Sequence, residues 1–381
     1  MKKNGKSIFF IEFILMIFVF GIMSDARLID SYIHPKRVNN KFYMNDPVEQ
    51  DLAYNFWGKD HFINVNGAIC DLMGKSCMND VVKLDNGYLY TPIERTSDQT
   101  LCKYADSTRK LNDYLKKRGS TLVYVTTPVT VSKYDPELPA GIEDHGNENI
   151  DRFLKLIEEA GIDIIDIRKE MYEDRIDQYE MMYKTDLHWK TDVGIYVYKL
   201  LEDYITDKTG CATDARILDP ANYTVTVYEK WHLGSRGYRT GIYFAGIDDF
   251  SLITPRFDTL LTDGNGTEGS MQELMLDMTP LQNRDYTARY TYDDVLKKTY
   301  GDFTNQKSMN DIRILLISDS MGKAVIPYLA MGFKYVHSVR NYYSEMITPE
   351  YIEAYDPDVV ILLYYPEYLM ENKEGFSFQN F

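Results

Sequence analysis

Three side chains in two separate segments could together carry out nucleophilic catalysis, and the first two lie close in sequence. Asp186 and His188 are two residues apart, so both side chains project from the same side of an extended chain. The Asp186 carboxylate can then accept a hydrogen bond from one imidazole nitrogen, which leaves the other nitrogen as a base. The alternative is a solvated aspartate beside a packed histidine, with Thr185 or Asp186 capping the helix that follows.

The third side chain, Ser320, lies where an apolar strand gives way to a helix. Residues 312–317 (IRILLI) form a continuous apolar run, and Ser318, Asp319 and Ser320 follow it, with Gly322 close behind. A serine at such a turn is exposed at the carboxyl end of a parallel sheet, where α/β proteins place their sites. Backbone N–H groups at the start of the helix could hold an oxyanion. An ordinary N-cap serine is the alternative.

The elements that would position these residues alternate between strands and helices from residue 110 onward. Uninterrupted apolar strands separated by helices indicate a parallel sheet covered on both faces. The predicted strands are residues 121–126, 162–167, 312–317, 333–339 and 359–363, and the predicted helices are residues 110–118, 149–160, 192–205, 321–331 and 349–355.

The pattern changes at about residues 212–305. Residues 223–228 and 286–292 alternate like half-exposed strands, and Gly and Asp turns separate the segments. We interpret this stretch as a β-rich insertion within one α/β domain that covers residues 61–381.

The N-terminus has the layout of a signal peptide or a signal anchor. Three lysines precede an apolar run over residues 8–23, which a single glutamate interrupts. Residues 1–26 are therefore predicted to anchor the chain in the membrane, and residues 27–60 to form a stalk. Cleavage after Ala26 would instead release a secreted protein. Either way, the rest of the chain is expected outside the cytoplasm.

Composition narrows the classes of ligand. Lysine and arginine number 42 against 58 aspartates and glutamates, a net charge of −16, which excludes nucleic acid as a partner. There is no Cys-x-x-Cys and no Cys/His cluster, so no metal is expected. The G-x-G-x-x-G pattern at residues 264–269 lies in the β-rich insertion and is interpreted as a turn, so no cofactor is expected either.

Cysteines and a basic segment leave further alternatives open. Outside the cytoplasm, Cys70, Cys77, Cys102 and Cys211 could form up to two disulfides, and spacing alone favours Cys70 with Cys77. Residues 231–239 (WHLGSRGYR) form a small basic and aromatic patch that could bind an anionic glycan or could simply be solvated.

The combined motifs resemble those of the SGNH-hydrolase-like O-acetyltransferases that modify exopolysaccharides, the alginate acetylation proteins among them. The sequence is most similar to the DHHW protein family, whose name motif reads Asp186, Leu187, His188, Trp189 here, with leucine at the second position. Further segments that resemble these families are residues 57–62, 81–90, 125–128, 138–139, 183–189, 313–322 and 357–369.

The resemblance implies a flavodoxin-like α/β fold and a role for each motif residue. Ser320 would be the nucleophile, His188 the base and Asp186 its orienting acid. The typical Gly-Asp-Ser-Phe reads Ser-Asp-Ser-Met here, and the Gly and Asn that complete the oxyanion hole have no assignable match. Candidates for oxyanion or substrate contacts are Met321, Gly322, Asn341, Arg340, Trp189, Arg236 and Arg239.

These observations predict an extracytoplasmic O-acetyltransferase that acts on a cell-surface or secreted polysaccharide through an acyl-serine. The resemblance implies an acyl donor supplied by a membrane acyltransferase. A carbohydrate esterase, with water as the acceptor, is one alternative, and a catalytically inactive glycan-binding or assembly protein is another. The acidic balance favours a neutral or weakly charged glycan.

Overall fold

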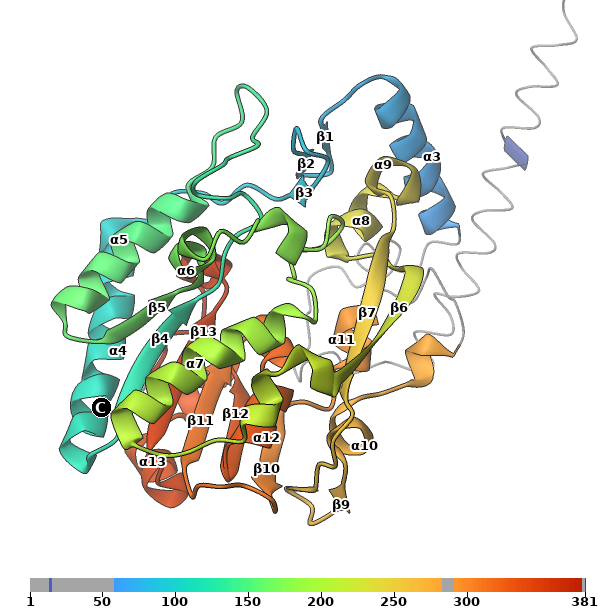
Figure 1. Cartoon of the computed structure of the whole chain (residues 1–381). Helices are drawn as coiled ribbons and strands as arrows, with labels where there is room; N and C mark the ends of the chain where they lie inside the picture. The colour runs from blue at the N-terminus through green and yellow to red at the C-terminus, as the bar shows by residue number, and fades with distance from the viewer. Residues whose placement is uncertain (1–13, 16–57, 283–290, 379–380) are drawn as a thin grey trace, which may run out of the picture. The chain divides into compact units, whose positions relative to one another are not determined.

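The computed structural model describes residues 14, 15, 58–282, 291–378 and 381. Contacts between Cα atoms divide the chain into residues 1–66 and residues 67–381. In the first unit, the described residues are helical at 14–15 and contain the beginning of α3 (Lys59–Leu72). The second unit holds the α/β domain shown in Figure 1.

A mixed sheet in the order β5-β4-β13-β11-β12-β10-β8-β9 forms the centre of the α/β domain. Its bounds are β5 Asp163–Asp166, β4 Thr121–Thr126, β13 Val359–Tyr364, β11 Arg313–Ser318, β12 Tyr335–Arg340, β10 Gly301–Asn305, β8 Leu261–Asp263 and β9 Glu268–Gly269. The pairs from β5 to β12 are parallel, and the pairs from β12 to β9 are antiparallel. The predicted α/β fold is confirmed, with a sheet that is mainly rather than wholly parallel.

Side chains alternate between two apolar layers along each central strand. In β11, Ile314 and Leu316 join one core cluster, and Leu315 and Ile317 join the other. The first cluster includes α6 (Ile167–Glu173), α7 (Val193–Thr209) and α12 (Ile326–Gly332), and the second includes α4 (Asp98–Arg118), α5 (Gly146–Glu159) and α13 (Pro349–Tyr355). Both faces of the sheet are therefore covered, as continuous apolar strands require.

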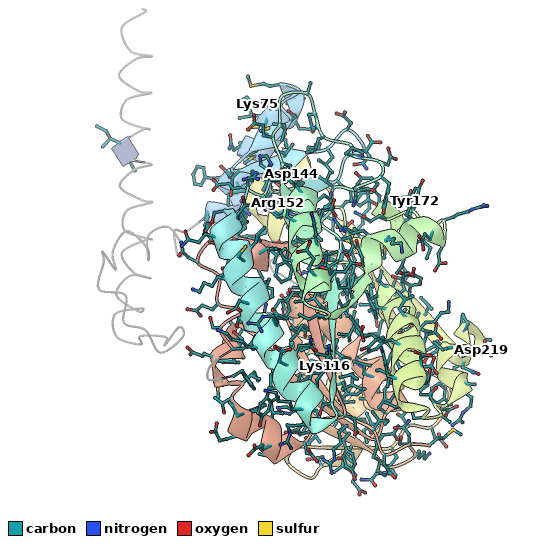
Figure 2. The ribbon with its side chains drawn as sticks, turned by 90° about the vertical axis from the view of Figure 1, so that its left-hand side faces the viewer. Lys75, Lys116, Asp144, Arg152, Tyr172 and Asp219 are labelled. Carbon is teal, nitrogen blue, oxygen red and sulfur yellow. The ribbon has the colours of Figure 1, made fainter. Side chains whose placement is uncertain are left out.

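Figure 2 views the layer in which α4 and α5 lie side by side. Lys116 of α4 donates to the Gly161 carbonyl at 2.8 Å, and Arg152 of α5 donates to the Thr96 carbonyl at 2.9 Å. Each contact joins one helix to the segment that flanks the other. The two helices thus support the sheet as one layer.

The middle of the chain contributes to two sheets. β6 (Tyr223–His232) and β7 (Asp248–Pro255) pair as an antiparallel hairpin, while β8, β9 and β10 extend the central sheet. Of the strand predicted at 286–292, residues 286–290 lie outside the described residues. Thr291 and Tyr292 begin the helix α11 (Thr291–Val295), so the strand prediction is wrong for these two.

Shorter elements complete the described structure. A small antiparallel sheet contains β1 (Cys77–Met78), β2 (Val81–Lys83) and β3 (Leu89–Tyr90). Short α-helices are α8 (Ser235–Thr240), α9 (Ile242–Ala245) and α10 (Met271–Met275). Short 3-10 helices are η1 Tyr179–Met181, η2 Ala215–Leu218, η3 Pro220–Asn222, η4 Thr279–Leu281, η5 Ser320–Ala324, η6 Asn341–Met346 and η7 Pro366–Leu369.

The predicted anchor and stalk fall almost wholly outside the described residues. Among the helices of the described part, none has both the length and the apolar character needed to cross a bilayer. Cys77, Cys102 and Cys211 carry free thiols. The pairing of Cys70 with Cys77 that spacing favoured is therefore not formed in this structure.

Candidate active site

The turn that carries Ser320 begins where β11 ends. Asp319 caps η5, and its carboxylate accepts hydrogen bonds from the Met321 N–H at 2.8 Å and from the Tyr365 N–H. A Cβ at Gly322 would lie 2.1 Å from the Ser318 Oγ, so only glycine fits there. The helix predicted at residues 321–331 is divided into η5 and α12.

Hydrogen bonds connect Ser320, His188 and Asp186 in a single chain. The His188 Nε2 lies 2.6 Å from the Ser320 Oγ, and the His188 Nδ1 lies 2.9 Å from the Asp186 Oδ2. His188 is 3 % exposed and Asp186 is 0 % exposed. A carboxylate only accepts, so Nδ1 carries a proton and Nε2 can accept the proton of Ser320. The structure thus brings together the three side chains that the sequence singled out.

Asp186 is surrounded by donors, although it is buried. Its Oδ1 accepts from the Leu187 N–H at 2.8 Å, from the Ser235 N–H at 3.1 Å and from the Ser235 hydroxyl at 2.8 Å. Its Oδ2 accepts from His188 and, at 3.1 Å, from the His232 Nε2. A buried charge needs such a complement of partners. The site is therefore built to hold an anion at this position.

The titration of Asp186 and His188 follows from their contact. Burial works to raise the pKa of Asp186, but the charges and hydrogen bonds of His188 and His232 outweigh burial and hold that pKa well below its ordinary value of 3.8. Burial works to lower the pKa of His188, yet the charge and hydrogen bond of Asp186 raise it above its ordinary value of 6.5. Asp186 is thus ionised wherever His188 titrates.

We expect kcat/KM for an aryl ester to rise with pH along a single limb whose midpoint lies above 6.5. His188 must be unprotonated to accept the proton of Ser320, and its pKa is raised, so the active form is lost as the pH falls through that value. Initial rates between pH 5 and pH 9 in constant ionic strength, corrected for spontaneous hydrolysis, measure the limb. A midpoint below the ordinary histidine value would contradict the role assigned to Asp186.

Two aromatic side chains fix the turn and the imidazole from other directions. The Trp189 indole N–H donates to the Met321 carbonyl at 3.0 Å, and the Tyr292 hydroxyl donates to the Ser320 carbonyl at 3.2 Å. The Tyr292 ring also stacks on His188, with centroids 4.5 Å apart and planes 24° apart. Trp189, a candidate for substrate contact, is 0 % exposed and instead supports the nucleophile turn.

Replacing Trp189 with phenylalanine should lower the free energy of unfolding by at least about 1–3 kcal/mol, because a buried hydrogen bond is lost and the smaller ring leaves part of its space unfilled. The Met321 carbonyl would keep its longer contact, at 3.4 Å, with the Tyr292 hydroxyl. Urea unfolding of the two proteins measures the difference. The matched control is Trp231→Phe, since the Trp231 indole N–H donates to the Pro280 carbonyl from a partly buried position away from the turn. Equal stability of Trp189→Phe and the parent would exclude the supporting role.

The backbone donors proposed for an oxyanion are partly occupied. The Met321 N–H donates to the Asp319 carboxylate, and the Gly322 N–H donates to the Asp319 carbonyl at 3.1 Å. The interpretation of Met321 and Gly322 as donors to an oxyanion is therefore corrected, because both N–H groups form hydrogen bonds within the turn. Within the described residues, no hydrogen bond from the Ser320 N–H is found, so this N–H remains a candidate donor to an oxyanion.

Arg340 and Asn341 lie beside the nucleophile turn because β12 is parallel to β11, with Arg340 opposite Ser318. The Arg340 guanidinium lies 4.5 Å from the centroid of Tyr300, whose hydroxyl donates to the Asp319 carbonyl. Asn341 is 0 % exposed, and its amide has no hydrogen-bond partner among the described residues. Both candidates therefore lie at the carboxyl ends of the parallel strands, where Ser320 also lies.

The basic patch expected at residues 231–239 is not a free surface. Arg236 is 3 % exposed and donates to the carbonyls of Leu89 and Asp186, at 2.8 and 3.0 Å. It also donates to the hydroxyls of Thr130 and Tyr365. Arg239 pairs with Asp80. Arg236 thus joins β3 to three loop residues, and the interpretation of it as a substrate contact is corrected.

Among the described residues, no group of three or more histidine, cysteine or acidic side chains is placed to hold a metal ion.

Two further residues at this site, His232 and Tyr292, are not indicated by the sequence. His232 lies in the predicted basic patch, and Tyr292 lies in a predicted strand. No local pattern marks either one, because both reach the site from distant segments.

Comparisons with known proteins agree with the predicted resemblance. Residues 84–212 match the family described as an SGNH hydrolase-like domain of the acetyltransferase AlgX, a stretch that includes Asp186 and His188 but not Ser320. The structure of Bacillus cereus PatB1 with a sulfonyl adduct is similar at 18 % identity and a TM-score of 0.61, covering 80 % of this chain and 99 % of that one.

A second solved structure, that of a DHHW family protein from Eubacterium siraeum, is similar at 16 % identity and a TM-score of 0.56. It covers 79 % of this chain and 95 % of that one. At these identities the likeness shows a shared fold. The comparison with curated proteins gives no match.

Proposed function

We propose that this protein is an O-acetyltransferase that acts outside the cytoplasm on a cell-surface or secreted polysaccharide, with Ser320 as the nucleophile. The continuous hydrogen-bonded chain from Asp186 through His188 to Ser320 carries the proposal. The match of residues 84–212 to an acetyltransferase family supports the class of reaction. The buried, ionised Asp186 supplies the orientation that a histidine base requires.

In the first half-reaction, the His188 Nε2 takes the proton of Ser320 as its Oγ bonds to the carbonyl carbon of an acyl donor. Negative charge then develops on the carbonyl oxygen, toward which the Ser320 N–H can point. As the bond to the leaving group breaks, His188 returns the proton to it, and an acetyl ester remains on Ser320.

In the second half-reaction, a sugar hydroxyl takes the place of the leaving group. His188 removes its proton as the oxygen attacks the acetyl carbonyl, and the bond to the Ser320 Oγ breaks with return of that proton to Ser320. If water attacked instead, the same site would be an esterase. The two outcomes differ only in the acceptor.

The donor and the location are also part of the proposal. A membrane acyltransferase partner would supply the acetyl group, and residues 1–26 would anchor the chain beside it; the basic flank and the apolar run of that segment support the anchor. A neutral or weakly charged glycan is the acceptor we favour. The net charge is −16, and the two arginines of the basic patch do not offset it, because Arg236 is buried and already bonded and Arg239 pairs with Asp80.

Incubation of the protein with an aryl acetate and oligosaccharides tests this function. We expect acetylated sugar by mass spectrometry, with neutral oligosaccharides acetylated faster than oligosaccharides of uronic acids at equal concentration. Ser320→Ala gives the background. Release of acetate with no acetylated sugar from any acceptor would establish an esterase, and a preference for uronic acids would overturn the proposed acceptor.

A further inference from the structure

A second histidine contacts the acid of the site. His232, the last residue of β6, is 0 % exposed, and its Nε2 lies 3.1 Å from the Asp186 Oδ2. The same oxygen accepts from the His188 Nδ1 at 2.9 Å. The two imidazoles therefore donate to one carboxylate oxygen, and only His188 reaches Ser320.

The other side-chain contacts of the His232 ring are aromatic. Its ring packs on Tyr183, with centroids 4.3 Å apart, and lies 6.5 Å from the ring of Phe250. Its Nδ1 has no hydrogen-bond partner among the described residues. A buried nitrogen without a partner is costly, and an apolar side chain would fill this space without that cost. The contact with Asp186 is therefore the polar interaction that accounts for a histidine here.

The chain after His232 also encloses Asp186. A Cβ at Gly234 would lie 2.1 Å from the Asp186 Cβ, and Ser235 donates to the Asp186 Oδ1 through both its N–H and its hydroxyl. Residues 232–235 thus hold both carboxylate oxygens from one side. The β6–β7 hairpin carries this segment, so the hairpin positions the acid of the site.

We propose that His232 is a positioning residue for the reaction: its Nε2–H holds the Asp186 carboxylate in the orientation that His188 needs. This inference rests on the proposed function. His232 supplies no proton to the reacting atoms, and its effect reaches Ser320 only through Asp186 and His188.

The direction in which His232 shifts the pKa of His188 follows from its contact with Asp186. The groups that act on the Asp186–His188 pair are His232 and Ser235 from the hairpin side, and Asp293 and Asp319 from α11 and the nucleophile turn. A donor to Asp186 stabilises the bare carboxylate most when His188 is neutral, because a protonated His188 already offsets that charge. Loss of the His232 donor should therefore raise the pKa at which His188 takes up its proton.

Histidine NMR of the full chain, titrated between pH 4 and pH 10, tests this directly. His188 is assigned as the signal missing from His188→Gln. In His232→Leu we expect the His188 midpoint to rise by about one pH unit, because the hydrogen bond from His232 to the charged carboxylate is stronger when His188 is neutral than when it is protonated. In His232→Gln, whose side-chain amide can place an N–H near the position of Nε2, we expect most of that shift to be reversed.

A His188 midpoint in His232→Leu equal to that of the parent would overturn the proposal, and so would equal shifts in the leucine and glutamine variants. His232→Met, of similar volume, replaces the leucine variant if that protein does not fold. The titration needs no turnover, so it decides the role of His232 even if the parent lacks activity that depends on Ser320. A parent protein without activity that depends on Ser320 would overturn the proposed function, not the role of His232.

Discussion

Ser320→Ala should lower kcat/KM for an aryl acetate by at least about a thousandfold, because the nucleophile is lost. The Oγ that lies 2.6 Å from the His188 Nε2 is the group removed, and no other hydroxyl contacts that nitrogen among the described residues. Steady-state hydrolysis of the aryl acetate measures the loss. Because the change deletes one oxygen from a tight turn, we expect the fold and the stability to be retained.

The control for this variant is a serine at the other end of the same strand. Ser308 lies before β11, and its hydroxyl donates to the Asn310 carbonyl, so Ser308→Ala makes the same chemical change away from the site. We expect Ser308→Ala to keep the parent activity. Ester turnover in Ser320→Ala equal to that of the control would place the catalytic group elsewhere or leave the protein without a serine-dependent activity.

Asp186→Asn should have an effect nearly as large, with a loss of about a thousandfold or more in kcat/KM. An amide has one acceptor oxygen, whereas donors surround both oxygens of Asp186. The backbone N–H groups of Leu187 and Ser235 are fixed and demand an acceptor at the Oδ1 position. The NH2 group must then face His188 and His232.

That arrangement forces His188 into the wrong tautomer. Facing an NH2 group, the His188 Nδ1 must accept, so the proton moves to Nε2, which can then no longer take the proton of Ser320. Aryl acetate kinetics measure the loss, and circular dichroism establishes that the variant folds. Asp113→Asn, on the exposed surface of α4, is the matched control and should retain activity. Activity of Asp186→Asn within tenfold of the parent would contradict the role of Asp186.

The sheet was predictable where one residue pattern dominates. Residues 121–126 are the bounds of β4, and the strand predicted at 359–363 is one residue shorter than β13. Both strands are buried on both faces and read as continuous apolar runs. The antiparallel strands β8 and β10 are not distinguished from the insertion by sequence, because short strands with a partly exposed face carry a weaker pattern.

The proximity of Ser320, His188 and Asp186 could be anticipated, because their motifs place them at known positions relative to strands and turns. The remaining contacts could not. His232 meets Asp186 across 46 positions of chain through a hairpin, and Tyr292 reaches His188 from a separate helix. One signal was overlooked: an aspartate just before a turn captures the N–H two residues on, which is why the Met321 N–H is not open to an oxyanion.

Trapping of the acyl-enzyme tests the central claim most directly. The protein is mixed with an aryl acetate, quenched in acid within the first turnovers, digested and mapped by tandem mass spectrometry. An acetyl ester on Ser320, which disappears when an oligosaccharide acceptor is added before the quench, is the predicted result. Continued turnover with an acetyl group on another residue, or with no covalent intermediate at all, would contradict the assignment of Ser320 as the nucleophile.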